Sequence, residues 1–153
     1  MKKYIIIDRP GNWSKLSDFE IDLIDFGKIA SPLREYIISL DPNRYQIILP
    51  GNSAMETWMQ LNMPSSYEPL YVHAKRYSHD WVEGNPVVTV ETLPIKLSNK
   101  IPVIVDDVIS SGLTIKLAKE RNKHLFPLSS DIWQVFTPVS RREKMTGFEI
   151  QYQ

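Results

Sequence analysis

The stretch that most constrains the fold is a buried strand followed at once by two acidic residues, a small polar loop and a helix. Residues 101–105 (IPVIV) contain four β-branched side chains, a run typical of a strand buried on both faces of a parallel sheet. Asp106 and Asp107 end that strand, residues 110–114 form a hydroxyl-rich turn, and residues 115–121 have a helix-forming composition. This order predicts an α/β unit with polar chemistry at the carboxyl end of its strand.

The same order predicts an anion-binding site. Backbone N–H groups in a tight loop and at the following helix N-terminus lack intrahelical acceptors, so they can bind a phosphate. Gly112 permits a backbone conformation that a Cβ would hinder, while Ser110, Ser111 and Thr114 can donate hydroxyl hydrogen bonds or cap the helix. The two aspartates would repel a phosphate, and they suit hydroxyl groups instead. The predicted ligand is therefore a phosphorylated sugar.

This stretch resembles the phosphoribosyl diphosphate (PRPP) signature of the type I phosphoribosyltransferases: a hydrophobic strand, two acidic residues, two apolar or small positions, a Ser/Thr-rich turn, glycine, any residue and threonine. The resemblance is specific between Val103 and Thr114 and extends more loosely over residues 45–136. It implies that Asp106 and Asp107 are catalytic residues that face the ribose hydroxyls. It also implies a 5′-phosphate loop made of Ser110, Ser111, Gly112, Leu113 and Thr114. The alternative is an Asp-Asp turn and a Ser/Thr-capped helix that need no ligand.

A second polar loop follows another predicted strand. Residues 45–49 have the apolar character of a central strand, and they run into Gly51, Asn52 and Ser53 before a helical stretch at 54–62. In phosphoribosyltransferases the loop at this place binds the pyrophosphate of PRPP, so the resemblance implies that role here. The loop contains no Arg or Lys, which departs from the family pattern. A plain strand-to-helix turn is the alternative.

A third strand end carries two adjacent cations. Residues 71–74 predict a short strand, and Lys75, Arg76 and Tyr77 follow it. The 6-oxopurine phosphoribosyltransferases are similar here, which implies that Lys75 or Arg76 meets the pyrophosphate and that residues 79–84 belong to a flexible lid. Residues 86–90 would then be a strand of a lid hairpin. Solvated cations at a strand end are the alternative.

Composition limits the number of domains and the classes of partner. A chain of 153 residues with 42% hydrophobic residues is long enough for one domain with a real core. Eighteen basic and eighteen acidic residues cancel, so no global field attracts nucleic acid or a membrane surface. The absence of cysteine excludes disulfides and fits a reducing compartment. The early apolar run is too short for a signal peptide, and we expect a soluble, cytoplasmic protein.

We expect one α/β domain over residues 1–153, of the phosphoribosyltransferase type: a doubly wound, mainly parallel sheet flanked by helices, with a small hood. In this prediction 1–40 is an accessory, hood and packing region, 45–138 is the core and 139–153 contains a terminal strand. In such sheets ligands bind at the carboxyl ends of the strands, where all three polar loops fall.

Within the first forty residues, we expect an accessory strand at 4–7 and two helical segments. Apolar residues from Ile21 to Ile29 are spaced for one buried helical face, and Pro32 is expected to begin a second helical turn. Residues 132–137 predict a further strand after the helix of the central motif.

The resemblance implies a reaction as well as a ligand. A nucleobase nitrogen, of a purine or a pyrimidine, would displace pyrophosphate at ribose C1, with Mg²⁺ held chiefly by PRPP and touching Asp106 and Asp107 at most through water. Such an enzyme is a glycosyltransferase (pentosyltransferase) of nucleotide salvage, and many relatives are homodimers. Candidates for contact with the base are Val108, Ile109, Met145 and Phe148, with Trp13 and Phe19 as further rings that could stack on it.

The residue at position 110 leaves the identity of the acceptor base open. Many 6-oxopurine enzymes have an aspartate where this chain has Ser110, and a serine is a poor substitute for acid–base work on a purine ring. The orotate enzymes tolerate a hydroxyl residue there but share a lysine-rich lid, whereas residues 79–84 contain no lysine.

Two other functional classes remain open. One is a regulator that binds PRPP or a nucleotide without turnover, and the other is a plain phosphate-binding module in which the acid pair has no role.

Overall fold

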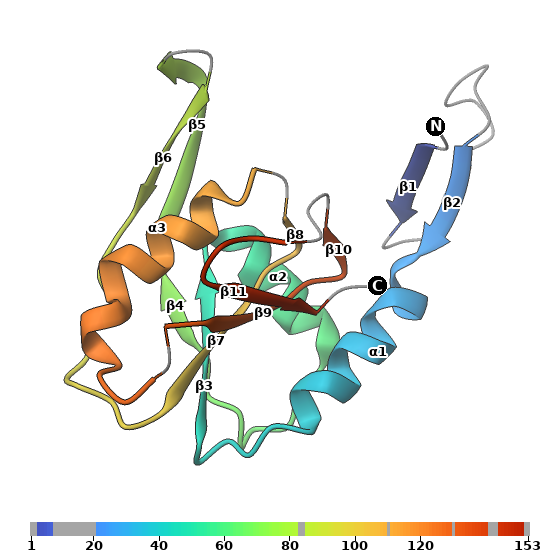
Figure 1. Cartoon of the computed structure of the whole chain (residues 1–153). Helices are drawn as coiled ribbons and strands as arrows, with labels where there is room; N and C mark the ends of the chain where they lie inside the picture. The colour runs from blue at the N-terminus through green and yellow to red at the C-terminus, as the bar shows by residue number, and fades with distance from the viewer. Residues whose placement is uncertain are drawn as a thin grey trace.

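The computed structural model describes residues 3–7, 21–82, 85–109, 111–129, 131–140 and 144–151. Figure 1 shows its arrangement, with a central sheet, helices on both sides of it, and two strand pairs that project from it. The helices are α1 (Phe26–Ile38), α2 (Asn52–Leu61), α3 (Leu113–Asn122) and a short 3-10 turn, η1 (Lys123–Leu125). The strands are β1 (Lys3–Ile7), β2 (Ile21–Asp25), β3 (Tyr45–Pro50), β4 (Leu70–Val72), β5 (Ala74–Val82), β6 (Asn85–Val90), β7 (Ile101–Val105), β8 (Val108–Ile109), β9 (Trp133–Phe136), β10 (Val139–Ser140) and β11 (Phe148–Gln151).

The central sheet has five parallel strands in the order β11-β9-β7-β3-β4. The three most apolar predicted strands, at 45–49, 101–105 and 132–137, are β3, β7 and β9 and lie side by side in its middle. The terminal strand predicted near the end of the chain is β11, which pairs with β9 at one edge. The predicted α/β class with a mainly parallel sheet is confirmed.

Alternate residues of the central strands bury against different layers. Ile47 and Leu49 of β3 belong to a core cluster with α1 and α2, whereas Ile48 between them belongs to the cluster that contains Ile115 and Ala118 of α3. Since successive side chains of a strand point to opposite faces, the sheet is covered by helices on both faces. This is the doubly wound arrangement that the β-branched run at 101–105 predicts.

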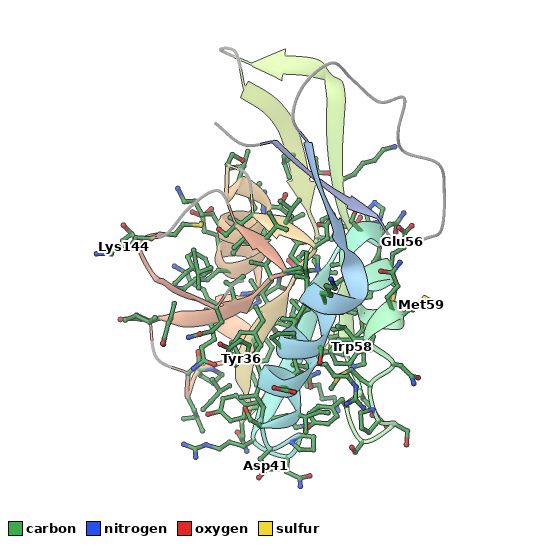
Figure 2. The ribbon with its side chains drawn as sticks, turned by 90° about the vertical axis from the view of Figure 1, so that its right-hand side faces the viewer. Tyr36, Asp41, Glu56, Trp58, Met59 and Lys144 are labelled. Carbon is green, nitrogen blue, oxygen red and sulfur yellow. The ribbon has the colours of Figure 1, made fainter. Side chains whose placement is uncertain are left out.

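In the layer formed by α1 and α2, residues that are neighbours in sequence differ sharply in burial. Trp58 of α2 packs in the core with 8% of its surface exposed, and the next residue, Met59, is 71% exposed and points away from the protein (Figure 2). On α1, Leu33 and Ile37 are buried, while the ring of Tyr36 contacts that of Phe136 with centroids 5.9 Å apart. None of the helices among the described residues is long and apolar enough to cross a membrane.

The two helical predictions for the first forty residues are each wrong in one respect. Residues 21–25, which we expected in a helix, form β2 and pair in parallel with β1. Their sequence, IDLID, puts Ile21 and Leu23 at a spacing of two, so it satisfies a strand once β1 supplies a partner. Pro32 lies inside α1 and does not begin a second helix. The proline removes one backbone donor, and burial of Ile29 and Leu33 on either side of it holds the helix together.

The predicted lid strand at 86–90 is the second strand of a long antiparallel hairpin. β6 pairs with β5, whose backbone continues in extended form to Val82, with a register irregularity between Tyr77 and Trp81. Residues 79–82 therefore lie in a strand, and 83–84 lie outside the described residues. A second small feature is the parallel pair β8–β10, which joins the residues after the acid pair to residues 139–140.

Burial of the central sheet between two layers of helices predicts how much stability the protein loses when one buried methyl group is removed. Ile104 of β7 is fully buried, so Ile104→Val is expected to lower the free energy of unfolding by about 1 kcal/mol. The matched control is Ile132→Val, because Ile132 is 58% exposed and the same deletion there should change stability by less than about 0.5 kcal/mol. Urea unfolding of both variants measures the difference. Equal effects would contradict the burial of β7.

Candidate functional site

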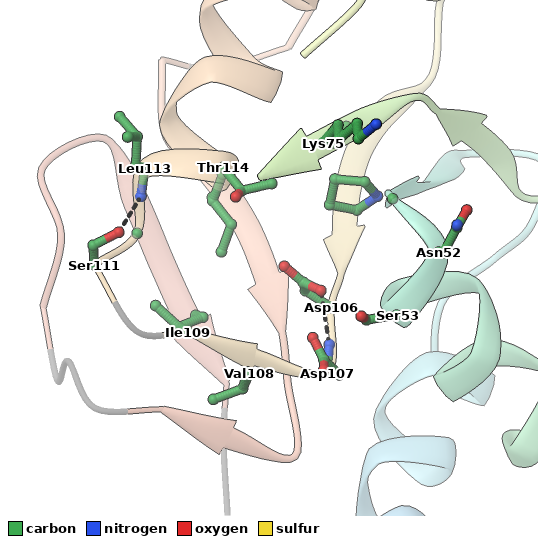
Figure 3. A pocket seen from close by; sticks show the side chains of 15 residues that line it. Asn52, Ser53, Lys75, Asp106, Asp107, Val108, Ile109, Ser111, Leu113 and Thr114 are labelled. Carbon is green, nitrogen blue, oxygen red and sulfur yellow. Dashed lines mark hydrogen bonds between the residues drawn. The ribbon is translucent and has the colours of Figure 1, made fainter. Parts of the chain in front are cut away.

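Three strand ends meet around a cavity of about 340 Å³ at the carboxyl edge of the sheet (Figure 3). It lies where β3 runs into α2, where β5 begins, and where the chain runs from β7 to α3. Its lining consists of Pro50, Gly51, Asn52, Ser53, Ala74, Lys75, Asp106, Asp107, Val108, Ile109, Ser111, Gly112, Leu113, Thr114 and Ile115. The predicted convergence of three separate loops is therefore present.

The first structural element of the site is the N-terminus of α3. Gly112 precedes the helix in the left-handed region, with φ 79°, and no described side chain caps the helix in the usual way. The Ser111 hydroxyl accepts a hydrogen bond from the Leu113 N–H at 3.3 Å, and intrahelical bonding begins with the Lys116 N–H, which donates to the Gly112 carbonyl at 3.0 Å. The N–H groups of Thr114 and Ile115 thus precede the first intrahelical donor, as anion binding requires.

The N-terminus of α2 is a second element of the same kind. Gly51, with φ 89°, precedes it without a side-chain cap, and the Met55 N–H donates to the Gly51 carbonyl at 3.2 Å. The Gly51 N–H donates a hydrogen bond to the Val72 carbonyl at 2.9 Å, and a Cβ on Gly51 would lie 3.2 Å from the Ala74 carbonyl oxygen. Glycine therefore meets two needs here, a positive φ and a close approach to the start of β5.

The acid pair lies between the two helix ends. Asp106 is buried, with 7% of its surface exposed, and its Oδ1 accepts the Asp107 N–H at 2.9 Å. Burial raises the pKa of Asp106 well above its ordinary value, the hydrogen bond to the Asp107 side chain and the repulsion between the two carboxylates raise it further, and the Asp107 N–H lowers it in part. The pair therefore holds a proton at higher pH than separate aspartates would, which reduces its repulsion of a phosphorylated ligand.

This pKa shift predicts how stability depends on pH. Because the folded-state pKa of Asp106 is raised, the folded protein binds the proton more tightly than the unfolded chain does. That contribution to stability is complete below about pH 4 and is lost as the pH rises through the folded-state pKa. An Asp106→Asn variant keeps the shape and the acceptor for the Asp107 N–H but cannot ionise. In urea unfolding between pH 4 and 8, the variant should gain stability relative to wild type as the pH rises, and a difference independent of pH would refute the shift.

The third element is the start of β5. Lys75 is exposed and lines the cavity (Figure 3). The backbones of Arg76 and Tyr77 continue β5, opposite Val88 and Val87, and their side chains lie outside the part of the chain that the structure describes. Lys75 thus supplies a cation at the cavity that the loop of residues 51–53 lacks.

The candidates for base contact divide between the cavity and the core. Val108, 39% exposed, and Ile109, fully buried, line the cavity. Met145 is 8% exposed in the core cluster on the α3 side of the sheet, and Phe148 packs against that cluster; neither lines the cavity. The structure therefore gives these two residues a packing environment. Ser110, Trp13 and Phe19 lie outside the described residues.

Several lining residues were missed by the sequence analysis. Pro50, Ala74 and Ile115 each lie directly beside a predicted loop, so the strand-end rule could have included them. Tyr71 was expected only as a strand residue, but its hydroxyl donates to Asn52 Oδ1 at 2.8 Å and fixes that side chain at the cavity edge. No local pattern indicates this contact, because the residues are brought together by the pairing of β3 with β4.

Comparisons with known proteins support the fold. No protein-family model matches the chain, and no curated protein sequence does. A crystal structure of a purine phosphoribosyltransferase from Pyrococcus horikoshii Ot3 is similar, with a TM-score of 0.56 and 20% identity, over 99% of this chain and 87% of that chain. A hypothetical protein from Neisseria gonorrhoeae with bound ppGpp is similar with a TM-score of 0.53 and 16% identity, over 99% and 82% of the two chains. The chain thus has a phosphoribosyltransferase-like fold.

Proposed function

We propose that this protein is a phosphoribosyltransferase that transfers the 5-phosphoribosyl group of Mg-PRPP to a nucleobase and releases pyrophosphate. The observation that carries the proposal is that two helix N-termini, those of α2 and α3, open into one cavity on either side of an acid pair. PRPP has a phosphate at C5 of its ribose and a diphosphate at C1. The pattern of anion site, carboxylates and anion site matches that order of groups.

Each loop would have one task in this reaction. The N–H groups at the start of α3 would hold the 5′-phosphate, and those at the start of α2, together with Lys75, would hold the pyrophosphate. Asp106 and Asp107 would accept hydrogen bonds from the ribose hydroxyls. The base would lie towards Val108, the exposed apolar residue of the cavity lining.

The chemistry would be a substitution at ribose C1. A nitrogen of the base forms a bond to C1 while the C1–O bond breaks, and the electron pair leaves with pyrophosphate. The nitrogen then loses its proton to solvent. Positive charge develops on the ribose ring in the transition state, so the negative charge of the acid pair favours it, and the cavity holds both reactants in line.

The carboxylates fit a Mg²⁺ that is held mainly by the substrate. Among the described residues no three His, Asp or Glu side chains gather to form a metal site. A raised pKa also makes Asp106 a weaker direct ligand. Asp107 would contact hydrated Mg²⁺ through water, and the ion would neutralise charge on the pyrophosphate when bound with it.

A second candidate function is nucleotide binding without turnover. It is favoured by the bound ppGpp in the similar Neisseria structure and by the lack of a cation in residues 51–53. A nucleotide with diphosphate groups on ribose presents anions and hydroxyls as PRPP does, so the same cavity would bind it as a regulatory ligand.

Pyrophosphate release separates the two functions. Protein with Mg²⁺ and PRPP is incubated with adenine, hypoxanthine, guanine, xanthine, uracil or orotate, and the nucleotide product is identified by mass spectrometry. Release that requires one base and yields its nucleotide supports the enzyme. Binding of PRPP or ppGpp in calorimetry without release from any base supports the regulator. A folded protein that binds neither ligand contradicts both.

A further inference from the structure

Asn122, at the end of α3, is a buried polar residue outside the cavity. None of its surface is exposed, and it does not line the site. Its Oδ1 accepts the Leu93 N–H at 2.7 Å, and its Nδ2 donates to the carbonyls of Ala118 at 2.9 Å and Glu91 at 3.3 Å. The side-chain amide therefore uses its oxygen and both of its N–H hydrogens, and two of its three partners belong to the segment that follows β6.

That segment closes the base of the β5–β6 hairpin. The Glu91 N–H donates to the His73 carbonyl at 2.9 Å, directly beyond the pair Ala74–Val90. The next pair is Lys75 with Thr89, so the cation at the cavity stands two pairing steps from the residue that Asn122 holds. A continuous path of hydrogen bonds and strand pairing thus joins the C-terminal end of α3 to Lys75.

We propose that Asn122 is a positioning residue that fixes the base of the β5–β6 hairpin against α3 and thereby sets where Lys75 stands in the cavity. Val90, Leu93 and Ala118 also belong to one apolar core cluster, but apolar packing tolerates sliding. The buried amide of Asn122 instead accepts a hydrogen bond from one backbone N–H and donates one to a backbone carbonyl of the segment after β6, and this pair of bonds allows a single register. The inference rests on the proposed function only in the task given to Lys75, which is binding of the diphosphate group.

A double-mutant cycle tests whether Asn122 acts through Lys75. Binding of inorganic pyrophosphate with Mg²⁺ is measured by calorimetry for wild type, Asn122→Ser, Lys75→Met and the double variant. We expect Asn122→Ser to weaken binding roughly fivefold when Lys75 is present and less than about twofold when it is absent. An equal loss in both backgrounds, or no loss at all, would overturn the proposal.

Two further variants separate positioning from loss of stability. Leu125→Ala removes a buried side chain just beyond Asn122 and lowers stability without touching the Asn122 hydrogen bonds, so pyrophosphate affinity should stay within about twofold of wild type. Asn122→Asp keeps the acceptor for the Leu93 N–H and removes both donors. It replaces the serine variant if that one does not fold, with the same expected pattern.

Amide hydrogen exchange tests the same contact without any ligand. In Asn122→Ser the Glu91 N–H should exchange roughly tenfold faster than the global change in stability explains, because the hairpin base opens locally. In Leu125→Ala it should change only with global stability. If wild type does not bind pyrophosphate, the proposed function fails while this measurement still decides the positioning role. Equal acceleration of the Glu91 amide in both variants would overturn that role.

Discussion

A Gly112→Val variant is expected to bind PRPP roughly 100-fold more weakly than wild type. Gly112 has φ 79° at the start of α3, a region that a β-branched residue adopts only with strain. Either the loop shifts or the new side chain occupies the cavity that Gly112 lines. Losing about two charge-assisted hydrogen bonds to the phosphate corresponds to roughly 3 kcal/mol, which is the stated loss of affinity.

The chain offers a matched control for this experiment. Gly147 also has a positive φ, 83°, and it lies beside the Lys119 side chain, away from the cavity lining. Gly147→Val should therefore lower stability, by about 1–3 kcal/mol of strain, and leave PRPP affinity unchanged. Calorimetric titration of both variants with Mg-PRPP gives the comparison. Comparable losses of affinity would show that strain, and not the phosphate loop, explains the effect of Gly112→Val.

An Asp107→Asn variant is expected to weaken PRPP binding by roughly 10- to 100-fold, which is the cost of replacing one charged hydrogen-bond acceptor. Asp107 lines the cavity beside the buried Asp106, and under the proposed function it binds a ribose hydroxyl. Inorganic phosphate carries no sugar hydroxyl groups, and the Asp107 carboxylate repels it. Its affinity should stay constant or rise in the variant.

The control for Asp107→Asn removes one negative charge elsewhere. Glu120 lies on the exposed surface of α3, outside the cavity lining. Glu120→Gln should therefore alter neither the affinity for PRPP nor that for inorganic phosphate. Calorimetry with PRPP and with phosphate completes the set. A PRPP affinity unchanged in Asp107→Asn would support the plain phosphate-binding module, in which the acid pair has no role.

The central strands were predictable because their own residues are enough to identify them as strands. Runs such as residues 101–105 are apolar at every position, and a fully buried parallel strand is the structure that such a run favours. The site followed from the same elements, since the carboxyl ends of parallel strands meet at one edge. Gly51, Lys75 and Gly112 lie in different parts of the sequence, and the structure brings all three to one cavity.

The failures occurred where pairing partners or packing decided the structure. Residues 21–25 carry a pattern that suits either a helix or a strand, and only the pairing with β1 selects the strand. Met145 was a candidate for base contact because it lies outside the predicted core strands, and the structure buries it in the core. The sequence analysis assigned no role to Asn122, because a polar residue at a helix end is usually solvated and nothing local indicates that this one is buried.

The most direct test of the account is a titration of ¹⁵N-labelled protein with ribose 5-phosphate, followed by amide NMR shifts. The cavity should bind the phosphate at the start of α3, so the largest shifts are expected at the amides of Gly112, Leu113, Thr114 and Ile115. Gly112→Val should abolish these shifts. Wild-type protein that stays folded and shows its largest shifts away from residues 111–115, or none at millimolar ligand, would contradict the claim that this loop binds the phosphate.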